Sequence, residues 1–233
     1  MTAGTSARSR LVLIILFAAA FGYVEAAVVV YLRALYYPGG FQFPLRIFEP
    51  GLLFVELFRE AATLVMLGAV AVLSGRTHWD RFGAFLVAFG VWDITFYLWL
   101  RVATGWPATL LEWDILFLLP LPWIGPVLAP SLIAAIMVAG GAWMMLLAGR
   151  GIILKVTLPS TVLAAAGTVS LLYSFMRDTG ATLHGEMPAP YSYLLLGAGA
   201  GCYVAAILML RRGYSGAEEQ GNGGGSPPVS PRT

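Results

Sequence analysis

The chain has 233 residues, of which 59% are hydrophobic and only 11% are charged, with a formal net charge of +2. Soluble globular domains carry about 25% charged residues. The composition therefore excludes a soluble globular protein and predicts an all-α, polytopic membrane protein.

Six apolar stretches have the length of transmembrane helices, because about 20 apolar residues cross the hydrocarbon core of a bilayer. The first stretch is longer than the ~7–15-residue core of a signal peptide, so we expect it to be retained. The six predicted spans are Leu11–Tyr36, Leu52–Ser74, Phe82–Ala103, Val127–Leu147, Ile152–Met176 and Tyr191–Leu210. Together they predict a six-helix transmembrane domain over residues 1–212. The Gly- and Ser-rich residues 213–233 are expected to be a disordered cytoplasmic tail.

Basic residues predict the orientation, since cytoplasmic loops are enriched in Lys and Arg. If the N-terminus faces the cytoplasm, nine basic residues lie on the cytoplasmic side: Arg8, Arg10, Arg76, Arg81, Arg150, Lys155, Arg211, Arg212 and Arg232. The outer side then holds four: Arg33, Arg46, Arg101 and Arg177. We therefore expect a multi-pass protein of the cell membrane, an inner membrane in a cell with two, with both termini in the cytoplasm.

The apolar stretch at 106–130 resembles a seventh span. A crossing there would move Arg150, Lys155, Arg211 and Arg212 to the outer side, and three prolines at 120, 122 and 126 would break the helix. We therefore predict a short helix near Ala108–Leu119 that lies at the outer interface or re-enters the membrane, between the third and fourth spans.

Charged residues inside the predicted spans mark the candidate site: Glu25, Glu56, Arg59, Glu60 and Asp93. An ionisable group at the bilayer centre costs roughly 2.5–3.5 kcal/mol on insertion scales, so such groups usually have a partner or a function. Counting 1.5 Å per residue from the expected outer ends of their helices places Glu25, Glu60 and Asp93 at a similar depth, about 12–13 Å.

The spacing of these residues predicts that they face one another. Glu56, Arg59, Glu60 and Thr63 occupy one stripe of the second span, and Asp93 shares a stripe with Tyr97 on the third. Polar stripes turn away from lipid, so the first three helices are expected to enclose a polar centre. The alternative is that the charges only pair with one another and lock the bundle.

The charge count favours a functional role for the cluster. Four carboxylates share one deeply placed cation, Arg59. An unpaired carboxylate in a medium of low dielectric constant takes up a proton or attracts a cation. Either outcome suits proton or cation transport, and proton transfer also suits catalysis.

The pattern WDIxF occurs twice, at 92–96 and at 113–117. Trp113 could belong to the outer aromatic belt, with Asp114 as an exposed helix cap. Alternatively, Asp114 and Glu112 could form a lid over the buried cluster. We include Trp113 and Asp114 among the candidate site residues.

The remaining motifs predict little chemistry. His78 belongs to a loop with Arg76, Asp80 and Arg81 and is expected on a solvated face. His184 could complete a metal site above Glu56 and Asp114, but one available histidine makes such a site a weak expectation. Neither a metal nor another cofactor is therefore predicted. Glycines in the fourth span (Gly140, Gly141) and a GxxxG pair in the sixth (Gly197, Gly201) predict that spans four to six form a close-packed scaffold.

Three functions stay open on the sequence alone. The first is proton- or cation-linked transport or binding, and the second is a structural or assembly subunit of a membrane complex. The third is an intramembrane enzyme that acts on a lipid or isoprenoid, so enzymatic activity is undecided. The expected partners are the lipid bilayer, a proton or cation and other membrane subunits, but not nucleic acid.

Overall fold

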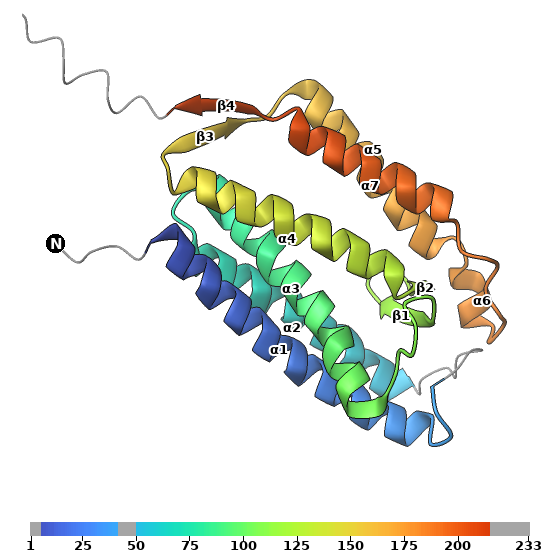
Figure 1. The fold of residues 1–233 in the computed structure, drawn as a ribbon. Coiled ribbons are helices and arrows are strands. Elements are labelled where there is room, and N and C mark those ends of the chain that lie inside the picture. Colours follow the sequence, from blue (N-terminus) through green and yellow to red (C-terminus); the bar gives the residue numbers. More distant parts are fainter. Residues whose placement is uncertain (1–5, 42–49, 215–233) are drawn as a thin grey trace, which may run out of the picture.

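The computed structural model describes residues 6–41 and 50–214. Its elements are seven helices, a β-hairpin and a second two-stranded antiparallel sheet (Figure 1). The helices are α1 (Ala7–Tyr36), α2 (Pro50–Ser74), α3 (His78–Thr104), α4 (Leu128–Ala148), α5 (Leu158–Met176), α6 (Thr179–Leu183) and α7 (Tyr193–Leu208). The strands are β1 (Trp113–Phe117), β2 (Trp123–Pro126), β3 (Ile152–Lys155) and β4 (Arg211–Tyr214).

Five helices, α1 to α5, are each long and apolar enough to cross a membrane. The sixth predicted span corresponds to α7, which has 16 residues and is shorter than the others. Large side chains on the periphery are exposed, for example Leu73 at 86% and Leu194 at 83%, which suits contact with lipid rather than water. The predicted helical membrane architecture is thus confirmed, whereas the count of six crossings stays a prediction.

Helix ends follow local capping chemistry. The Thr77 side chain accepts a hydrogen bond from the backbone N–H of Asp80 and starts α3, and Thr157 forms a capping box with Ser160 at the start of α5. At the other end of α3, Gly105 adopts a left-handed conformation with φ of 76° and stops the helix.

Helix α3 is the centre of the main bundle and contacts α1, α2 and α4. Glycines allow α3 and α4 to approach at backbone distance. A Cβ atom added at Gly141 would lie 2.5 Å from the carbonyl oxygen of Gly83, and one added at Gly90 would lie 2.5 Å from the carbonyl oxygen of Ala134. The buried core between α1, α2, α3 and α4 includes Ile14, Ala18, Leu67, Val87 and Met145.

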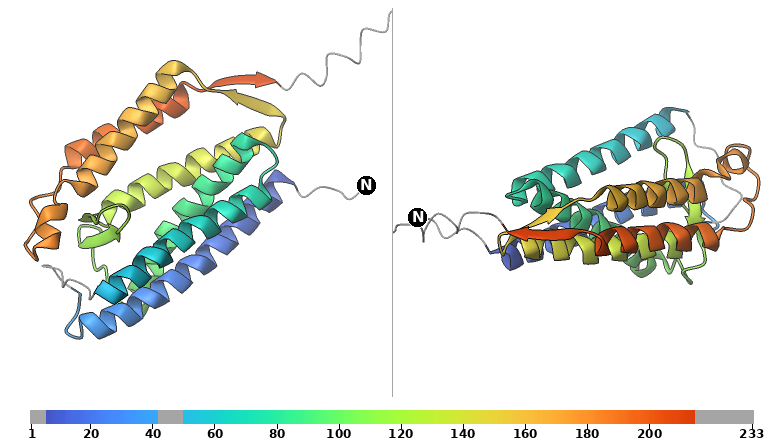
Figure 2. Two further views of the ribbon diagram at one scale, coloured as in Figure 1. Left: turned by 180° about the vertical axis from the view of Figure 1, so that it is seen from behind. Right: turned by 90° about the horizontal axis from the view of Figure 1, so that it is seen from above.

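Helices α5 and α7 pack on each other as a separate pair (Figures 1 and 2). Gly167 and Gly199 form their close approach, because a Cβ at Gly167 would lie 3.0 Å from the Gly199 carbonyl oxygen. Nothing lies within 4 Å of a Cβ placed at Gly197 or Gly201, so the predicted GxxxG contact is wrong. The predicted scaffold of spans four to six is also wrong, since α4 packs mainly on α3.

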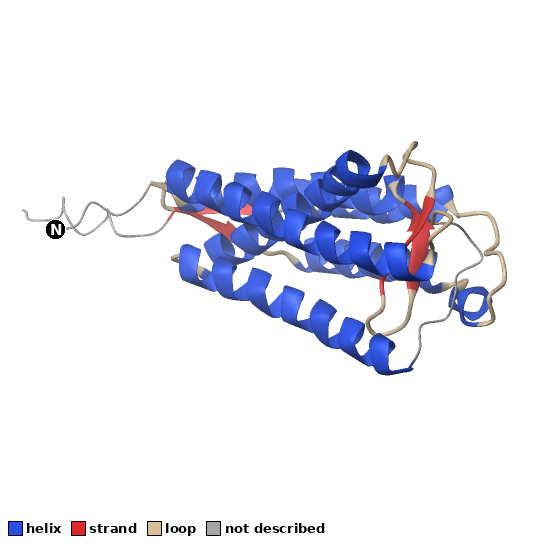
Figure 3. Cartoon of the chain, turned by 90° about the horizontal axis from the view of Figure 1, so that it is seen from below, coloured by secondary structure: helices blue, strands red, loops and turns tan. Residues whose placement is uncertain are grey.

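The segment between α3 and α4 forms a β-hairpin instead of the short helix predicted at Ala108–Leu119. Strands β1 and β2 pair antiparallel with Asp114 opposite Gly125, and they cross one end of the bundle (Figure 3). The residues of β1 are WDILF, and Trp, Ile and Phe favour extended strands. Pairing with β2 satisfies the backbone groups that a proline-broken helix would leave free.

A second two-stranded sheet, formed by β3 and β4 from either side of α5–α7 in the chain, lies at the opposite end of the bundle (Figure 1). The predicted fifth span starts too early for this reason, because 152–155 form β3 and α5 begins at Leu158. Strand β4 includes Gly213 and Tyr214, the first two residues of the predicted tail, and residues 215–233 lie outside the described residues. The bundle end with the β3–β4 sheet is called the basic end, because it carries Arg8, Arg10, Arg76, Arg81, Arg150 and Lys155. The opposite end is called the hairpin end after β1–β2.

Candidate functional site

Arg59 lies between carboxylates of two helices. Its Nη1 pairs with Oε2 of Glu25 on α1, and its Nε donates to Oε2 of Glu56 on α2 at 2.9 Å. Glu25 and Glu56 are each 4% exposed. The hydroxyl of Thr63 donates to the other oxygen of Glu25 at 3.0 Å. The predicted stripe on α2 therefore faces α1, and a single guanidinium group bridges two buried carboxylates.

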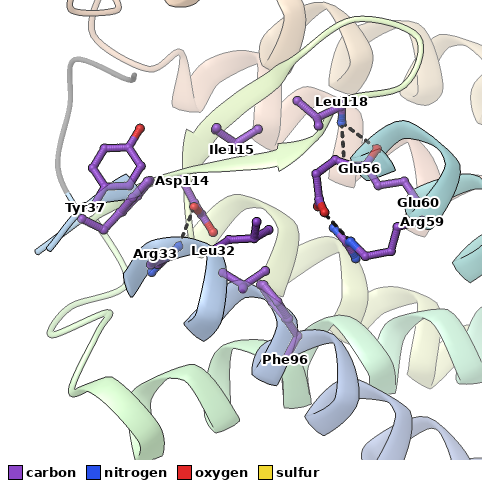
Figure 4. Close-up of a pocket in the computed structure, with 12 residues that line it drawn as sticks. Leu32, Arg33, Tyr37, Glu56, Arg59, Glu60, Phe96, Asp114, Ile115 and Leu118 are labelled. Atoms are coloured by element: carbon purple, nitrogen blue, oxygen red, sulfur yellow. Dashed lines mark hydrogen bonds and ion pairs between the residues drawn. The ribbon is translucent and has the colours of Figure 1, made fainter. Parts of the chain in front are cut away.

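Glu60 binds to the β-hairpin rather than to an arginine. Both of its carboxylate oxygens accept the backbone N–H of Leu118, at 3.1 and 2.9 Å. Leu118 follows directly after β1, and Figure 4 shows the two groups facing each other. This hydrogen bond attaches the hairpin to α2 at the level of the charged cluster. Because the donor is a main-chain group, no side-chain motif could have predicted it.

Asp93 is the carboxylate with the fewest partners. Its Oδ2 atom is buried and has no hydrogen-bond partner within residues 6–41 and 50–214. It lines a cavity of about 60 Å³ together with Glu25, Arg59, Glu60 and Tyr97, and the hairpin residues Ile115, Leu116 and Phe117 cover one side of it. The structure thus brings the deep predicted residues to one cavity between α1, α2, α3 and β1.

A second ion pair lies nearer the hairpin end. Nη2 of Arg33 on α1 donates to Oδ1 of Asp114 on β1 at 2.9 Å, and Figure 4 shows the two side chains pointing toward each other. The Arg33 guanidinium carbon lies 4.0 Å from the centre of the Phe41 ring and 3.8 Å from that of Trp106. Such cation–π contacts hold the guanidinium group in place.

Two small neighbouring cavities are lined by the residues of these ion pairs. The second cavity, of about 80 Å³, is lined by Arg33, Glu56 and Asp114 near the hairpin end. It shares Val29, Arg59, Glu60, Phe96 and Ile115 with the first cavity. Each is large enough for a few water molecules, since one water needs ~10–15 Å³ by this measure. Polar groups from Asp114 to Asp93 therefore line two neighbouring cavities.

Asp114 is buried, with 3% of its surface exposed, so it is not an exposed cap. It belongs to strand β1, outside the helices that cross the membrane. Burial raises the pKa of Asp114 to about 6 from its ordinary value of 3.8, while the Arg33 charge, the Ile115 N–H and a hydrogen bond from the Tyr97 hydroxyl oppose that rise. Tyr97 is also buried, and its hydrogen bond to Asp114 links α3 to the hairpin.

The other candidates lie outside the cluster. Trp113 packs edge-to-face on Tyr191, with ring centres 6.1 Å apart. Glu112 accepts hydrogen bonds from the N–H groups of Ala108 and Thr109, so it stabilises the turn before β1 and is not part of a lid. His184 is exposed and contacts the Gly180 carbonyl, away from Glu56 and Asp114. In the described residues, no three His, Cys, Asp or Glu side chains come together as metal ligands.

One buried ion pair contradicts the sequence interpretation. Asp80, expected on a solvated face, is 1% exposed and pairs with Nη1 of Arg10 at 2.5 Å at the basic end. Its Oδ2 also accepts the N–H of Arg76 at 2.8 Å. The sequence feature that could have predicted this pair is the position of Asp80 in the first turn of an apolar helix, at the same end of the bundle as a basic residue at the start of α1.

Comparison with known proteins gives no further information on the site, because no family model, curated protein or solved structure matches the chain.

Proposed function

We propose that the protein is a proton-linked transport or binding protein of the membrane, and that the cluster between α1, α2, α3 and the β1–β2 hairpin takes up and releases protons. The observation that carries this proposal is the excess of buried carboxylates. Four buried carboxylates (Glu25, Glu56, Glu60 and Asp114), together with Asp93, whose Oδ2 atom is buried, lie close to two guanidinium groups, those of Arg33 and Arg59. If every group were ionised, the site would carry five negative and two positive charges, a net charge of −3.

A protein in a bilayer cannot keep such a charge without compensation. Removing an ion from water costs several kcal/mol even after the surroundings relax, and only a partner, a proton or a cation offsets that cost. Arg59 pairs with Glu25 and Glu56, and Arg33 pairs with Asp114, so two positive charges face three of the carboxylates. Asp93, whose Oδ2 has no partner in the described part of the chain, is the group that most needs a proton.

The geometry favours protons over a divalent cation. Hard divalent cations take six or more oxygen ligands. The carboxylates are instead distributed along two adjoining cavities and are separated by guanidinium groups. Separated acids with water-sized spaces between them suit stepwise proton transfer. The proposed path enters at the hairpin end through Asp114 and reaches Asp93 and Glu25 inside the bundle.

The proposal is tested by proton flux into vesicles that contain the purified protein. A pH-sensitive dye is enclosed, a pH gradient is applied, and the membrane potential is clamped with potassium and valinomycin. We expect flux with the wild type, and none above protein-free vesicles with Asp93→Asn or Glu60→Gln, since both substitutions keep the side-chain shape and remove the titratable group. The matched control is Glu186→Gln, an exposed carboxylate outside the cluster, which should keep wild-type flux.

Two outcomes would overturn the proposal. One is normal flux in both Asp93→Asn and Glu60→Gln. The other is a folded, correctly inserted wild type that carries no flux under any gradient. In that case the ion pairs would only fix how the helices pack against one another, as expected of an assembly subunit.

A further inference from the structure

An apolar groove separates the main bundle from the α5–α7 pair. It has a volume of about 420 Å³, within the ~300–1,000 Å³ range of ligand pockets. Each neighbouring helix contributes one face. The lining residues of α4 are Ile133, Ile136, Met137, Gly140 and Met144, which follow helical spacing. Trp79, Phe82 and Leu86 of α3 lie at the basic end, and α5 and α7 provide the opposite wall.

The few polar groups of the groove are already hydrogen-bonded within the protein. The Thr168 hydroxyl is 2.7 Å from that of Tyr203. The Ser160 and Thr161 hydroxyls donate to the carbonyl oxygen of Thr157 at 2.7 and 3.2 Å. A ligand inside the groove therefore meets almost only hydrocarbon, and its buried part should be apolar.

The dimensions match one acyl chain. From Ile133 to Met144 the groove follows eleven residues of α4, which is about 16 Å at 1.5 Å per residue. The hydrocarbon core of a bilayer is ~30 Å thick, so the chains of one leaflet reach ~15 Å. The groove thus extends from the basic end to the middle of the membrane.

The charge at the basic end indicates the headgroup. Arg81 precedes Phe82, Lys155 precedes Val156, and Arg150 lies in the turn between α4 and β3. All three are exposed, and none forms an ion pair in the described part of the chain. The one carboxylate near them that the structure describes, Asp80, is buried and paired with Arg10. Such a group of cations attracts anionic lipid headgroups.

We propose that this groove binds one acyl chain of an anionic phospholipid from the leaflet at the basic end, and that Arg150 and Lys155 hold its phosphate. The segment 215–233 is a poor alternative occupant, because it is rich in Gly, Ser, Pro and Glu. Helices α4 and α7 meet only at isolated points such as Gly140, whose added Cβ would lie 3.2 Å from Ile207. A lipid chain in the groove would bridge the main bundle and the α5–α7 pair.

The test uses the full chain in phosphatidylcholine vesicles that contain a small fraction of phosphatidylglycerol with a photoreactive diazirine near the end of one acyl chain. After illumination, mass spectrometry locates the lipid adducts. We expect adducts at groove residues, Met137 and Ile207 among them, above the level at the lipid-facing residue Val204, which is 45% exposed. Unlabelled phosphatidylglycerol should compete for these adducts better than unlabelled phosphatidylcholine.

A pair of neighbouring residues on α5 provides the matched variants. Ala164 lines the groove, whereas Ala165 is exposed on another face. Ala164→Trp fills the groove, and the adducts at Met137 and Ile207 should fall about tenfold, equivalent to about 1.4 kcal/mol of binding free energy. Ala165→Trp should leave them unchanged. Ala206→Phe is a second filling variant in case Ala164→Trp does not fold, which size-exclusion chromatography detects.

The headgroup is tested separately. Arg150→Gln with Lys155→Gln should remove the preference for phosphatidylglycerol and keep labelling by a phosphatidylcholine probe. Equal competition by both lipids in the wild type would overturn the anionic headgroup. Adducts no more frequent in the groove than at Val204 would overturn the site. Cross-links between two copies of the chain through groove residues would also overturn it, because a helix would then occupy the groove.

Discussion

Arg59 shows how one residue keeps two charges inside the bundle. It pairs with Glu25 on α1 and with Glu56 three residues earlier on its own helix. Breaking a buried pair by removing one partner typically costs about 3–5 kcal/mol, because a charge is left without compensation. The Arg59 pairs therefore fix the packing of α1 against α2, whereas Asp93 lacks such a partner. Within one cluster, the paired charges thus hold the helices together.

Asp114 provides a pH-dependent prediction at the scale of a residue. Its pKa in the folded protein is about 6, above the ordinary value of 3.8. The folded state therefore binds this proton more tightly than the unfolded state. The resulting stabilisation is complete below about pH 3.8 and is lost as the pH rises through about 6. At 1.36 kcal/mol per pKa unit its upper limit is ~3 kcal/mol.

The measurement is thermal unfolding in detergent micelles from pH 4 to 8, compared between the wild type and Asp114→Asn. The difference cancels the titration of groups that do not interact with Asp114. The wild type should lose stability relative to the variant between pH 4 and 7. Arg33→Gln should move this change to higher pH, since the Arg33 charge lowers the pKa of Asp114. If the difference in unfolding temperature between the wild type and Asp114→Asn did not change with pH, the raised pKa of Asp114 would be contradicted.

At the scale of elements, the contact between α3 and α4 depends on glycine. A Cβ added at Gly141 would lie 2.5 Å from the Gly83 carbonyl oxygen and 3.0 Å from the backbone nitrogen of Val87. Backbone atoms cannot move aside as a flexible side chain can. Gly141→Ala should therefore force the helices apart and destabilise the protein by about 1–3 kcal/mol, the usual cost of overpacking.

Gly68 in α2 is the matched control for this prediction. Nothing lies within 4 Å of a Cβ placed there, so Gly68→Ala should gain helix propensity, up to about 1 kcal/mol. The unfolding temperatures of both variants are measured in the same detergent. If Gly141→Ala were as stable as Gly68→Ala, α3 and α4 would not pack at backbone distance.

The sequence predicts the long helices better than it predicts the strands, and the reason is physical. Long apolar runs predict α1 to α4 to within a few residues, because crossing a membrane requires the length that the sequence shows. The spacing on α2 also predicts that the stripe of Glu56, Arg59, Glu60 and Thr63 faces the neighbouring helices. Both strand pairs, the β1–β2 hairpin and the β3–β4 sheet, were missed, since apolar runs such as WDILF and IILK have the same hydrophobicity in a strand as in a helix. The contact of Glu60 with the Leu118 N–H depends on that hairpin and was missed with it.

At the scale of the whole molecule, the two ends differ in charge and in construction. The basic end carries exposed cations and the short β3–β4 sheet, whereas the other end carries the β1–β2 hairpin that covers the carboxylate cluster. The described chain starts and ends at the basic end (Figure 1). Cytoplasmic ends of membrane proteins are enriched in Lys and Arg. By this rule we predict that the carboxylate cluster opens away from the cytoplasm.

The orientation is tested by labelling single cysteines in intact cells with a maleimide that cannot cross the membrane. The background is Cys202→Ser, which removes the one native cysteine. His184→Cys at the hairpin end should be labelled from outside, and His78→Cys at the basic end should be labelled only after the cells are permeabilised. Both native histidines are exposed, so burial does not explain a difference between the two sites. Labelling of residue 78 in intact cells would show that the basic end faces outward. The proposed proton path would then open toward the cytoplasm.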